Sequence, residues 1–160
     1  QKAWLQERIE VKHAKPTVAE QKAAYEKLFR AFAGTKVVVR ALDAGADKPL
    51  AFLNDAPEDN PALGLRGLRA LRANEQILRD QLAALAEADA AATAAGEGCD
   101  LWVMAPMVAT QEEAEWFVRR ARSFGLPQVG VMVETPAAAL TAEQLLGAAD
   151  FASIGTNDLL

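Results

Sequence analysis

The strongest constraint on the fold is the alternation of short apolar runs with longer stretches of helical periodicity. The short runs lie at residues 37–39, 101–104, 129–133 and 151–154, and helical patterns precede the first run and separate each run from the next. Strands that alternate with helices form parallel sheets in which the helices are the crossover connections. The sequence therefore predicts an α/β fold with four parallel strands, and the valine-rich run 37–39 is expected to be a buried strand.

Several helices are marked by their own start and stop signals. Thr17–Glu20 and Thr110–Glu113 are capping boxes, in which a hydroxyl and a carboxylate three residues apart satisfy free amides at a helix start. They predict helices over residues 17–34 and 110–125, each ending at a glycine. A longer helical stretch, in one or two pieces, covers about residues 65–95.

Chain length sets how much of a closed parallel fold these elements can build. An eight-stranded parallel barrel takes about 250 residues, whereas this chain has 160 and stops just after its fourth predicted strand. We therefore expect part of a (β/α)8 TIM barrel. Residues 16–160 form that part of the barrel domain, and residues 1–15 are an unassigned N-terminal segment without a clear pattern.

Composition excludes several classes of protein. The net charge is −5, which argues against a nucleic-acid-binding protein that relies on phosphate contacts. No apolar run approaches the roughly 20 residues of a membrane helix, so we expect no membrane insertion. Cys99 is the only cysteine, so no disulfide framework can form within the chain. A reducing, cytoplasmic setting is therefore expected.

Two carboxylates follow the third and fourth predicted strands. Ligands of parallel α/β folds bind beyond the carboxyl ends of the strands, which is where Glu134 and Asp158 lie in the sequence. Such a pair could hold Mg²⁺, whose remaining ligands are usually water and substrate phosphate. Alternatively, Glu134 caps the helix that begins at Pro136, and Asp158 caps whatever follows the fourth strand. The residues alone leave both interpretations open.

Two arginines are candidates for binding an anion at the same end. Arg40 leaves the first strand, and a guanidinium there needs a phosphate or a carboxylate partner; Asp43 and Asp47 could supply an ion pair instead. The second candidate, Arg66, follows a Pro/Gly loop that could direct it toward a site. It belongs to a charge run that would usually be a solvated helix face: Arg66, Arg69 and Arg72.

Several motifs together resemble one family. They are VVVRALDAGADK (37–48), NPALGLR (60–66), ILRDQL (77–82), MAPM (104–107), VMVETPAA (131–138) and FASIGTNDL (151–159). In this order they resemble the phosphoenolpyruvate-binding barrel of Enzyme I, the phosphoenolpyruvate–protein phosphotransferase family of the bacterial sugar phosphotransferase system. The resemblance covers roughly residues 16–159 and implies a TIM barrel.

The resemblance also implies a role for each candidate residue. Arg40 and Arg66 would hold the phosphate of phosphoenolpyruvate, Glu134 and Asp158 would bind Mg²⁺, and Asn157 would hydrogen-bond the substrate. These roles suit phosphoryl transfer, which depends on positioning and on neutralising negative charge. Arginine forks match phosphate oxygens in pairs.

For the parent protein, the resemblance implies transfer of a phosphoryl group through a histidine to a small carrier protein that is itself phosphorylated on histidine, in support of sugar uptake. It also implies a homodimer in the cytoplasm. The family's phosphorylated histidine and its proton-donating cysteine have no counterpart in this chain. We therefore expect no catalytic residue here, and an isolated chain that does not turn over.

Three alternatives remain at the level of the sequence. Pyruvate phosphate dikinase and phosphoenolpyruvate synthase share the barrel and similar site residues. A metal-dependent aldolase acting through a pyruvate enolate would also place a Glu and an Asp at strand ends, but would not need two arginines for a transferable phosphate. A non-catalytic dimerisation fragment is the third, since an open half-barrel exposes strand edges and apolar helix faces.

Overall fold

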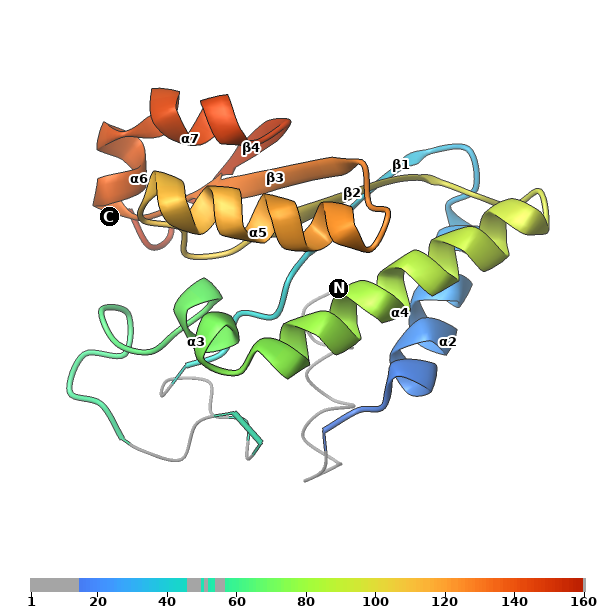
Figure 1. The fold of residues 1–160 in the computed structure, drawn as a ribbon, viewed down its shortest axis with the longest axis horizontal. Helices are drawn as coiled ribbons and strands as arrows, with labels where there is room; N and C mark the ends of the chain where they lie inside the picture. The colour runs from blue at the N-terminus through green and yellow to red at the C-terminus, as the bar shows by residue number, and fades with distance from the viewer. Residues whose placement is uncertain (1–14, 46–49, 51, 54–56, 160) are drawn as a thin grey trace.

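A four-stranded parallel sheet organises the chain (Figure 1). The structure, a computed structural model, describes residues 15–45, 50, 52–53 and 57–159, so nearly all of the unassigned N-terminal segment lies outside it. The strands lie side by side in chain order, and every neighbouring pair is parallel. They are β1 (Lys36–Arg40), β2 (Asp100–Ala105), β3 (Gln128–Val133) and β4 (Phe151–Ile154).

Among the described residues, one helix precedes the first strand, and the other helices connect each strand to the next. They are α2 (Val18–Ala31), α3 (Leu68–Ala73), α4 (Glu75–Ala94), α5 (Gln111–Ser123), α6 (Pro136–Leu140) and α7 (Ala142–Ala148). Helix α2 packs against α4, and α5 packs against β2 and β3 (Figure 1). The sheet is curled, and its alternation with helices confirms the predicted α/β fold, one part of a TIM barrel.

Both predicted capping boxes are present. The Thr17 hydroxyl accepts from the Glu20 backbone N–H at 3.1 Å, and the Glu20 carboxylate accepts from the Thr17 backbone N–H at 3.0 Å. Thr110 and Glu113 make the same two bonds at the start of α5, both at 3.2 Å. These local hydrogen bonds explain why both helix starts could be predicted from a few neighbouring residues.

The helix expected near residues 65–95 begins later and is interrupted. Helix α3 starts after Gly67, whose φ of +54° is not helical, so Arg66 lies in the preceding loop. A break at Asn74 separates α3 from α4, and the Asn74 side-chain amide donates to the Ala70 carbonyl at 3.1 Å. The helix that begins at Pro136 is likewise divided, because α6 ends at Leu140 and α7 begins two residues later.

Helix α4 is the longest described helix, and its apolar face is buried. Leu78, Leu82 and Leu85 are fully buried with Leu71 of α3, as their helical spacing predicts. The other face of α4 carries charged residues. Within the described ranges, no helix has both the length and the hydropathy needed to cross a bilayer.

The prediction that the first strand is buried was wrong. Val37 and Val39 are only partly buried against the core, and Val38 is 45% exposed. The reason is the place of β1 in the sheet: among the described residues it is an edge strand, paired with β2 alone. A β-branched run indicates a strand, but it does not tell how many neighbours that strand has.

Candidate functional site

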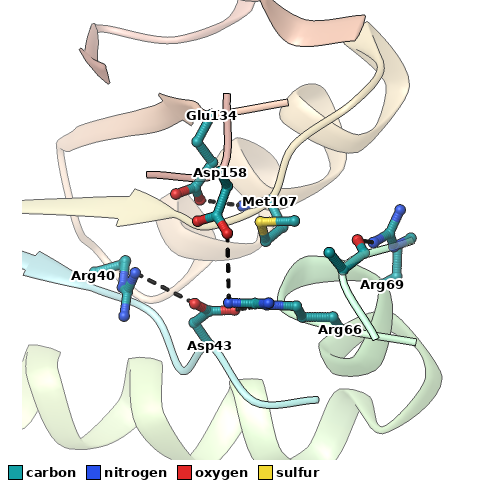
Figure 2. A network of polar contacts seen from close by, with 8 residues as sticks. Arg40, Asp43, Arg66, Arg69, Met107, Glu134 and Asp158 are labelled. Atoms are coloured by element: carbon teal, nitrogen blue, oxygen red, sulfur yellow. Dashed lines mark hydrogen bonds and ion pairs between the residues drawn. The ribbon is translucent and has the colours of Figure 1, made fainter. Parts of the chain in front are cut away.

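An acidic side chain in the loop after β1 is the centre of the site. The Asp43 side chain is only 2% exposed and lies between two arginines (Figure 2). Its Oδ2 lies 3.4 Å from Arg40 Nη1, and its Oδ1 accepts from Arg66 Nε at 3.3 Å. Arg66, also buried, places Nη2 4.0 Å from Asp158 Oδ1. Alternating charges therefore link the end of β1 to the turn after β4.

Arg40 has the ion pair that the sequence left open as an alternative to phosphate binding. Its partner is Asp43, whereas Asp47 lies outside the described residues. The Arg40 side chain remains 28% exposed. Because a guanidinium carries five N–H donors, one contact with Asp43 leaves donors for an anion. The ion pair and phosphate binding are therefore compatible.

Arg66 reaches Asp43 because the backbone makes a close approach at Gly67. Gly67 has a left-handed φ of +54°. A Cβ atom there would lie 2.8 Å from Met107 Cβ and 3.2 Å from Asp43 Oδ1. The Gly67 N–H also donates to the Ala44 carbonyl at 3.1 Å, which ties the start of α3 to the loop after β1. A side chain at position 67 would push the start of α3 away from Met107 and from the loop after β1.

Glu134, directly after β3, is buried and does not cap a helix. Its Oε1 accepts from the Met107 N–H at 2.7 Å. Met107 itself has a φ of +53°, a left-handed conformation that is uncommon outside glycine. The capping interpretation of Glu134 was wrong, because Thr135 caps α6: its hydroxyl accepts from the Ala138 N–H at 3.1 Å.

The surroundings of Glu134 favour its protonated form. Burial raises the pKa of the Glu134 carboxyl above its ordinary value, and the Met107 N–H opposes that shift. The negative charges of Asp43 and Asp158 raise the same pKa further, while Arg40 lowers it. A cation placed beside these carboxylates would reverse this balance and favour the ionised form.

The turn after β4 also needs a glycine against Glu134. A Cβ atom at Gly155 would lie 2.7 Å from Glu134 Cβ and 2.8 Å from Glu134 Oε2. The Gly155 N–H donates to the Val133 carbonyl at 3.0 Å, which extends the pairing of β3 with β4. This contact sets how closely the Asn157–Asp158 turn approaches the Glu134 carboxylate.

A cavity of about 320 Å³ lies beside these residues. Its charged lining residues are Glu134, Asp158 and Arg69, and Met107 and Thr135 contribute to its wall. Neither Arg40 nor Arg66 lines it directly; the Arg66–Asp158 contact joins the cavity to the arginine pair. The cavity and the charge network therefore form one site.

Arg69 is a site residue that the sequence analysis missed. It was placed in a charge run that would usually be a solvated helix face, and for Arg69 that prediction was wrong; Arg72 of the same run is exposed, as expected. Arg69 Nη2 donates to the Ala62 carbonyl at 3.0 Å, and its Nε is buried without a hydrogen-bond partner among the described residues. Arg72 instead pairs with Glu112 at 2.9 Å. Because the helix begins only after Gly67, the three arginines do not lie on one helix face.

Among the described residues, Asn157 makes fewer polar side-chain contacts than the other predicted site residues. It is exposed in the turn 157–159 that follows β4, beside Asp158. Within the described part of the chain, no hydrogen bond of its side chain is found. The fold therefore brings Arg40, Arg66, Glu134 and Asp158 together and leaves the Asn157 amide available to a ligand.

The carboxylate pair suits a hard divalent cation. Glu134 and Asp158 both line the cavity, and the Asp158 charge is close enough to raise the pKa of Glu134. No group of three or more His, Cys, Asp or Glu side chains in the described residues could hold a metal by itself. Mg²⁺ commonly takes one or two carboxylates and completes its shell with water and substrate phosphate. The donor set therefore fits Mg²⁺.

Comparisons with known proteins show similarity over most of this chain. The family model described as "PEP-utilising enzyme, PEP-binding domain" matches residues 7–160. A phosphoenolpyruvate-protein phosphotransferase of Streptomyces coelicolor is 50% identical over 145 residues, which is 90% of this chain and 25% of the relative. One of Haloferax volcanii is 42% identical over 90% of this chain and 27% of its own length.

A multiphosphoryl transfer protein of Rhodobacter capsulatus is more distant. It is 37% identical over 154 residues, covering 92% of this chain and 18% of the relative. The chain thus spans about a quarter or less of the length of these curated relatives. The similarity extends over nearly all of this chain and over one part of each longer protein.

Proposed function

This chain belongs to the family of PEP-binding domains of PEP-utilising enzymes, and from that premise we propose that it is the phosphoenolpyruvate-binding part of a phosphoenolpyruvate–protein phosphotransferase. One observation carries the proposal: residues from four different strand ends converge beside one cavity. These are Arg40 at the end of β1, Asp43 in the loop that follows it, Met107 after β2, Glu134 after β3 and Asp158 after β4. Such convergence at the carboxyl ends of parallel strands is where barrel enzymes bind substrate.

Arg40 and Arg66 bind the phosphate in this proposal. Asp43 contacts both guanidinium groups, at 3.4 Å and 3.3 Å, and so holds two cations near each other before substrate arrives. A phosphate oxyanion near this pair can then accept from the Arg40 guanidinium, which stays partly exposed, and is attracted by the charge of Arg66. Prior placement of the charges matters, because phosphoryl transfer depends on positioning and on charge neutralisation.

Glu134 and Asp158 hold Mg²⁺ in this proposal, and Asn157 donates to the substrate. A bound Mg²⁺ would neutralise negative charge on the substrate as the phosphoryl group leaves. The Met107 N–H orients Glu134 by fixing one of its oxygens at 2.7 Å. Gly155 allows the turn that carries Asp158 to approach the same carboxylate.

We assign the remaining steps of phosphoryl transfer to a longer protein of the kind that these relatives represent. There, the phosphoryl group would pass through a histidine to a small phosphocarrier protein in the cytoplasm, in support of sugar uptake. The names of the relatives, phosphoenolpyruvate-protein phosphotransferase and multiphosphoryl transfer protein, support this assignment. We expect the isolated 160-residue chain to bind substrate but to release no pyruvate above background.

Calorimetric titration of phosphoenolpyruvate into the chain, with and without Mg²⁺, tests the proposal. We expect binding that depends on Mg²⁺ and is lost in Glu134→Gln, which keeps the side-chain volume and an acceptor for Met107. Glu143→Gln is the matched control, since it removes an exposed carboxylate from α7, away from the cavity. Absence of binding by the folded wild-type chain, or equal binding by Glu134→Gln, would contradict the proposal.

We also propose that the chain self-associates as a homodimer or larger species. Large apolar side chains are exposed at its C-terminal end: Leu140 is 87% exposed, and Leu146 and Ile154 are exposed as well. Exposed apolar surface of this kind favours association. Sedimentation velocity should show a species larger than the monomer, and a single monomer peak across concentrations would contradict this expectation.

A further inference from the structure

A buried glutamine on α4 contacts the segment that carries the phosphate-binding residues. Gln81 belongs to the ILRDQL motif, to which the proposed function assigns no role. Its Oε1 accepts from the Leu42 backbone N–H at 3.0 Å, and its Nε2 donates to the Tyr25 hydroxyl at 2.9 Å. Leu42 lies between Arg40 and Asp43. Gln81 therefore connects the helical layer to the backbone between these two charged residues.

The chemistry of the partners fixes the orientation of the Gln81 amide. The Leu42 N–H can only donate, so the amide oxygen must face it. The amide nitrogen then faces Tyr25, whose hydroxyl accepts. Burial raises the Tyr25 pKa, so this hydroxyl remains protonated and the network is neutral. Tyr25 is held in turn by stacking on Phe29, with ring centroids 6.1 Å apart.

Three hydrogen bonds among the described residues hold the backbone of residues 41–44, and each has a different partner. The Ala41 N–H donates to the Met104 carbonyl at 2.9 Å, which continues the pairing of β1 with β2. The Ala44 carbonyl accepts from the Gly67 N–H at 3.1 Å. Between these two backbone contacts, Leu42 is held by a side chain. A substitution of Gln81 therefore removes one anchor while it leaves the sheet ladder and the Gly67 contact in place.

We propose that Gln81, held by Tyr25, is a positioning residue for substrate phosphate. By fixing the Leu42 N–H it sets the backbone from which Arg40 and Asp43 project, and with it the Arg40–Asp43–Arg66 arrangement. This inference rests on the proposed function, because it assigns Gln81 an effect on phosphoenolpyruvate affinity. Gln81 touches no substrate in this account and acts through the segment 40–43.

Gln81→Met in the 160-residue chain tests the inference, because methionine keeps the length of the side chain and loses both hydrogen bonds. Two quantities are measured: phosphoenolpyruvate affinity in the presence of Mg²⁺, and hydrogen exchange of the Leu42 amide relative to that of Val103 in the central strand β2. We expect about tenfold weaker binding, equivalent to about 1.4 kcal/mol. The exchange rate of the Leu42 amide, divided by that of the Val103 amide, should rise by about tenfold or more.

Two further variants separate positioning from general stability. Leu85→Ala removes a fully buried side chain from the same helix, one turn beyond Gln81. We expect it to lower the melting temperature at least as much as Gln81→Met while leaving both the affinity and the Leu42-to-Val103 exchange ratio near wild type. Tyr25→Phe deletes one hydroxyl, so it should fold and should weaken binding by about threefold, about 0.7 kcal/mol.

The outcomes distinguish failure of the positioning role of Gln81 from failure of the proposed function. If Gln81→Met binds phosphoenolpyruvate within twofold of wild type, or no more weakly than Leu85→Ala, the positioning role is refuted. If the wild-type chain binds no phosphoenolpyruvate, the proposed function fails. In that case the exchange ratio still decides whether Gln81 fixes the segment 40–43, and an unchanged ratio in Gln81→Met would refute this as well.

Discussion

Asp43→Asn should destabilise the free chain and change its response to phosphate. The substitution keeps the volume of the side chain and leaves an oxygen that can accept from Arg66. It removes the negative charge that lies 3.4 Å from Arg40 Nη1 and 3.3 Å from Arg66 Nε. Two guanidinium groups would then lie near each other without the carboxylate between them, and Arg66 would keep its contact with Asp158 at 4.0 Å.

The geometry sets the size of the expected loss. Removing one partner of a fully buried ion pair costs about 3–5 kcal/mol. Arg40 is 28% exposed, so water screens part of this effect. Both contacts are also longer than the roughly 2.8 Å of a strong charge-assisted hydrogen bond. We therefore expect the free energy of unfolding to fall by about 2 kcal/mol.

Phosphate should restore more stability to the variant than it adds to the wild type. A phosphate dianion can occupy the place of the lost carboxylate charge between Arg40 and Arg66. A ligand at one hundred times its Kd stabilises the folded state by about 2.7 kcal/mol, so a difference in affinity is readily measured. Urea unfolding followed by circular dichroism, in phosphate and in chloride of equal ionic strength, gives the two free energies.

Glu87→Gln is the control for loss of a negative charge, because Glu87 is an exposed residue of α4. It should leave the free energy of unfolding within about 0.5 kcal/mol of wild type in both salts. The reasoning is refuted if Asp43→Asn behaves like this control, or if phosphate stabilises wild type and Asp43→Asn equally.

Two further predictions concern the neighbouring carboxylate and the loop contact. Because the pKa of Glu134 is raised in the folded state, the folded chain binds more protons than the unfolded chain between the unfolded and folded pKa values, and stability should fall as pH rises through that interval. Glu134→Gln should flatten this pH dependence and raise the free energy of unfolding above the interval. Urea unfolding over a pH series measures this. If the carboxylate does not contribute, the free energy of unfolding will change with pH equally in Glu134→Gln and wild type. Gly67→Ala should cost at least about 1 kcal/mol, because of its positive φ and its contact with Met107 Cβ. Gly147→Ala, in α7 with open space around its Cβ position, should instead stabilise the chain by about 0.5–1 kcal/mol; equal melting temperatures for the two alanine variants would contradict the close approach at Gly67.

The sequence by itself determined which elements form and which end of the sheet carries the chemistry. Strands and helix starts depend on residues a few positions apart, such as the β-branched run at Val37–Val39 or the pair Thr110 and Glu113. Parallel topology then requires Arg40, Glu134 and Asp158 to meet at one end of the sheet, because each lies at or just after the carboxyl end of its strand. These features could be predicted without coordinates.

Only the tertiary structure decided how these groups contact one another. Gly67 and Asn74 alter the course of the predicted helix, so Arg66 enters the site from a loop and Arg69 contributes to the cavity. Glu134 binds the Met107 N–H, 27 residues away in the sequence, instead of capping the next helix. Gln81 reaches Leu42 across 39 residues. Such contacts depend on backbone dihedral angles and on packing between distant elements, neither of which is recorded in local spacing or periodicity.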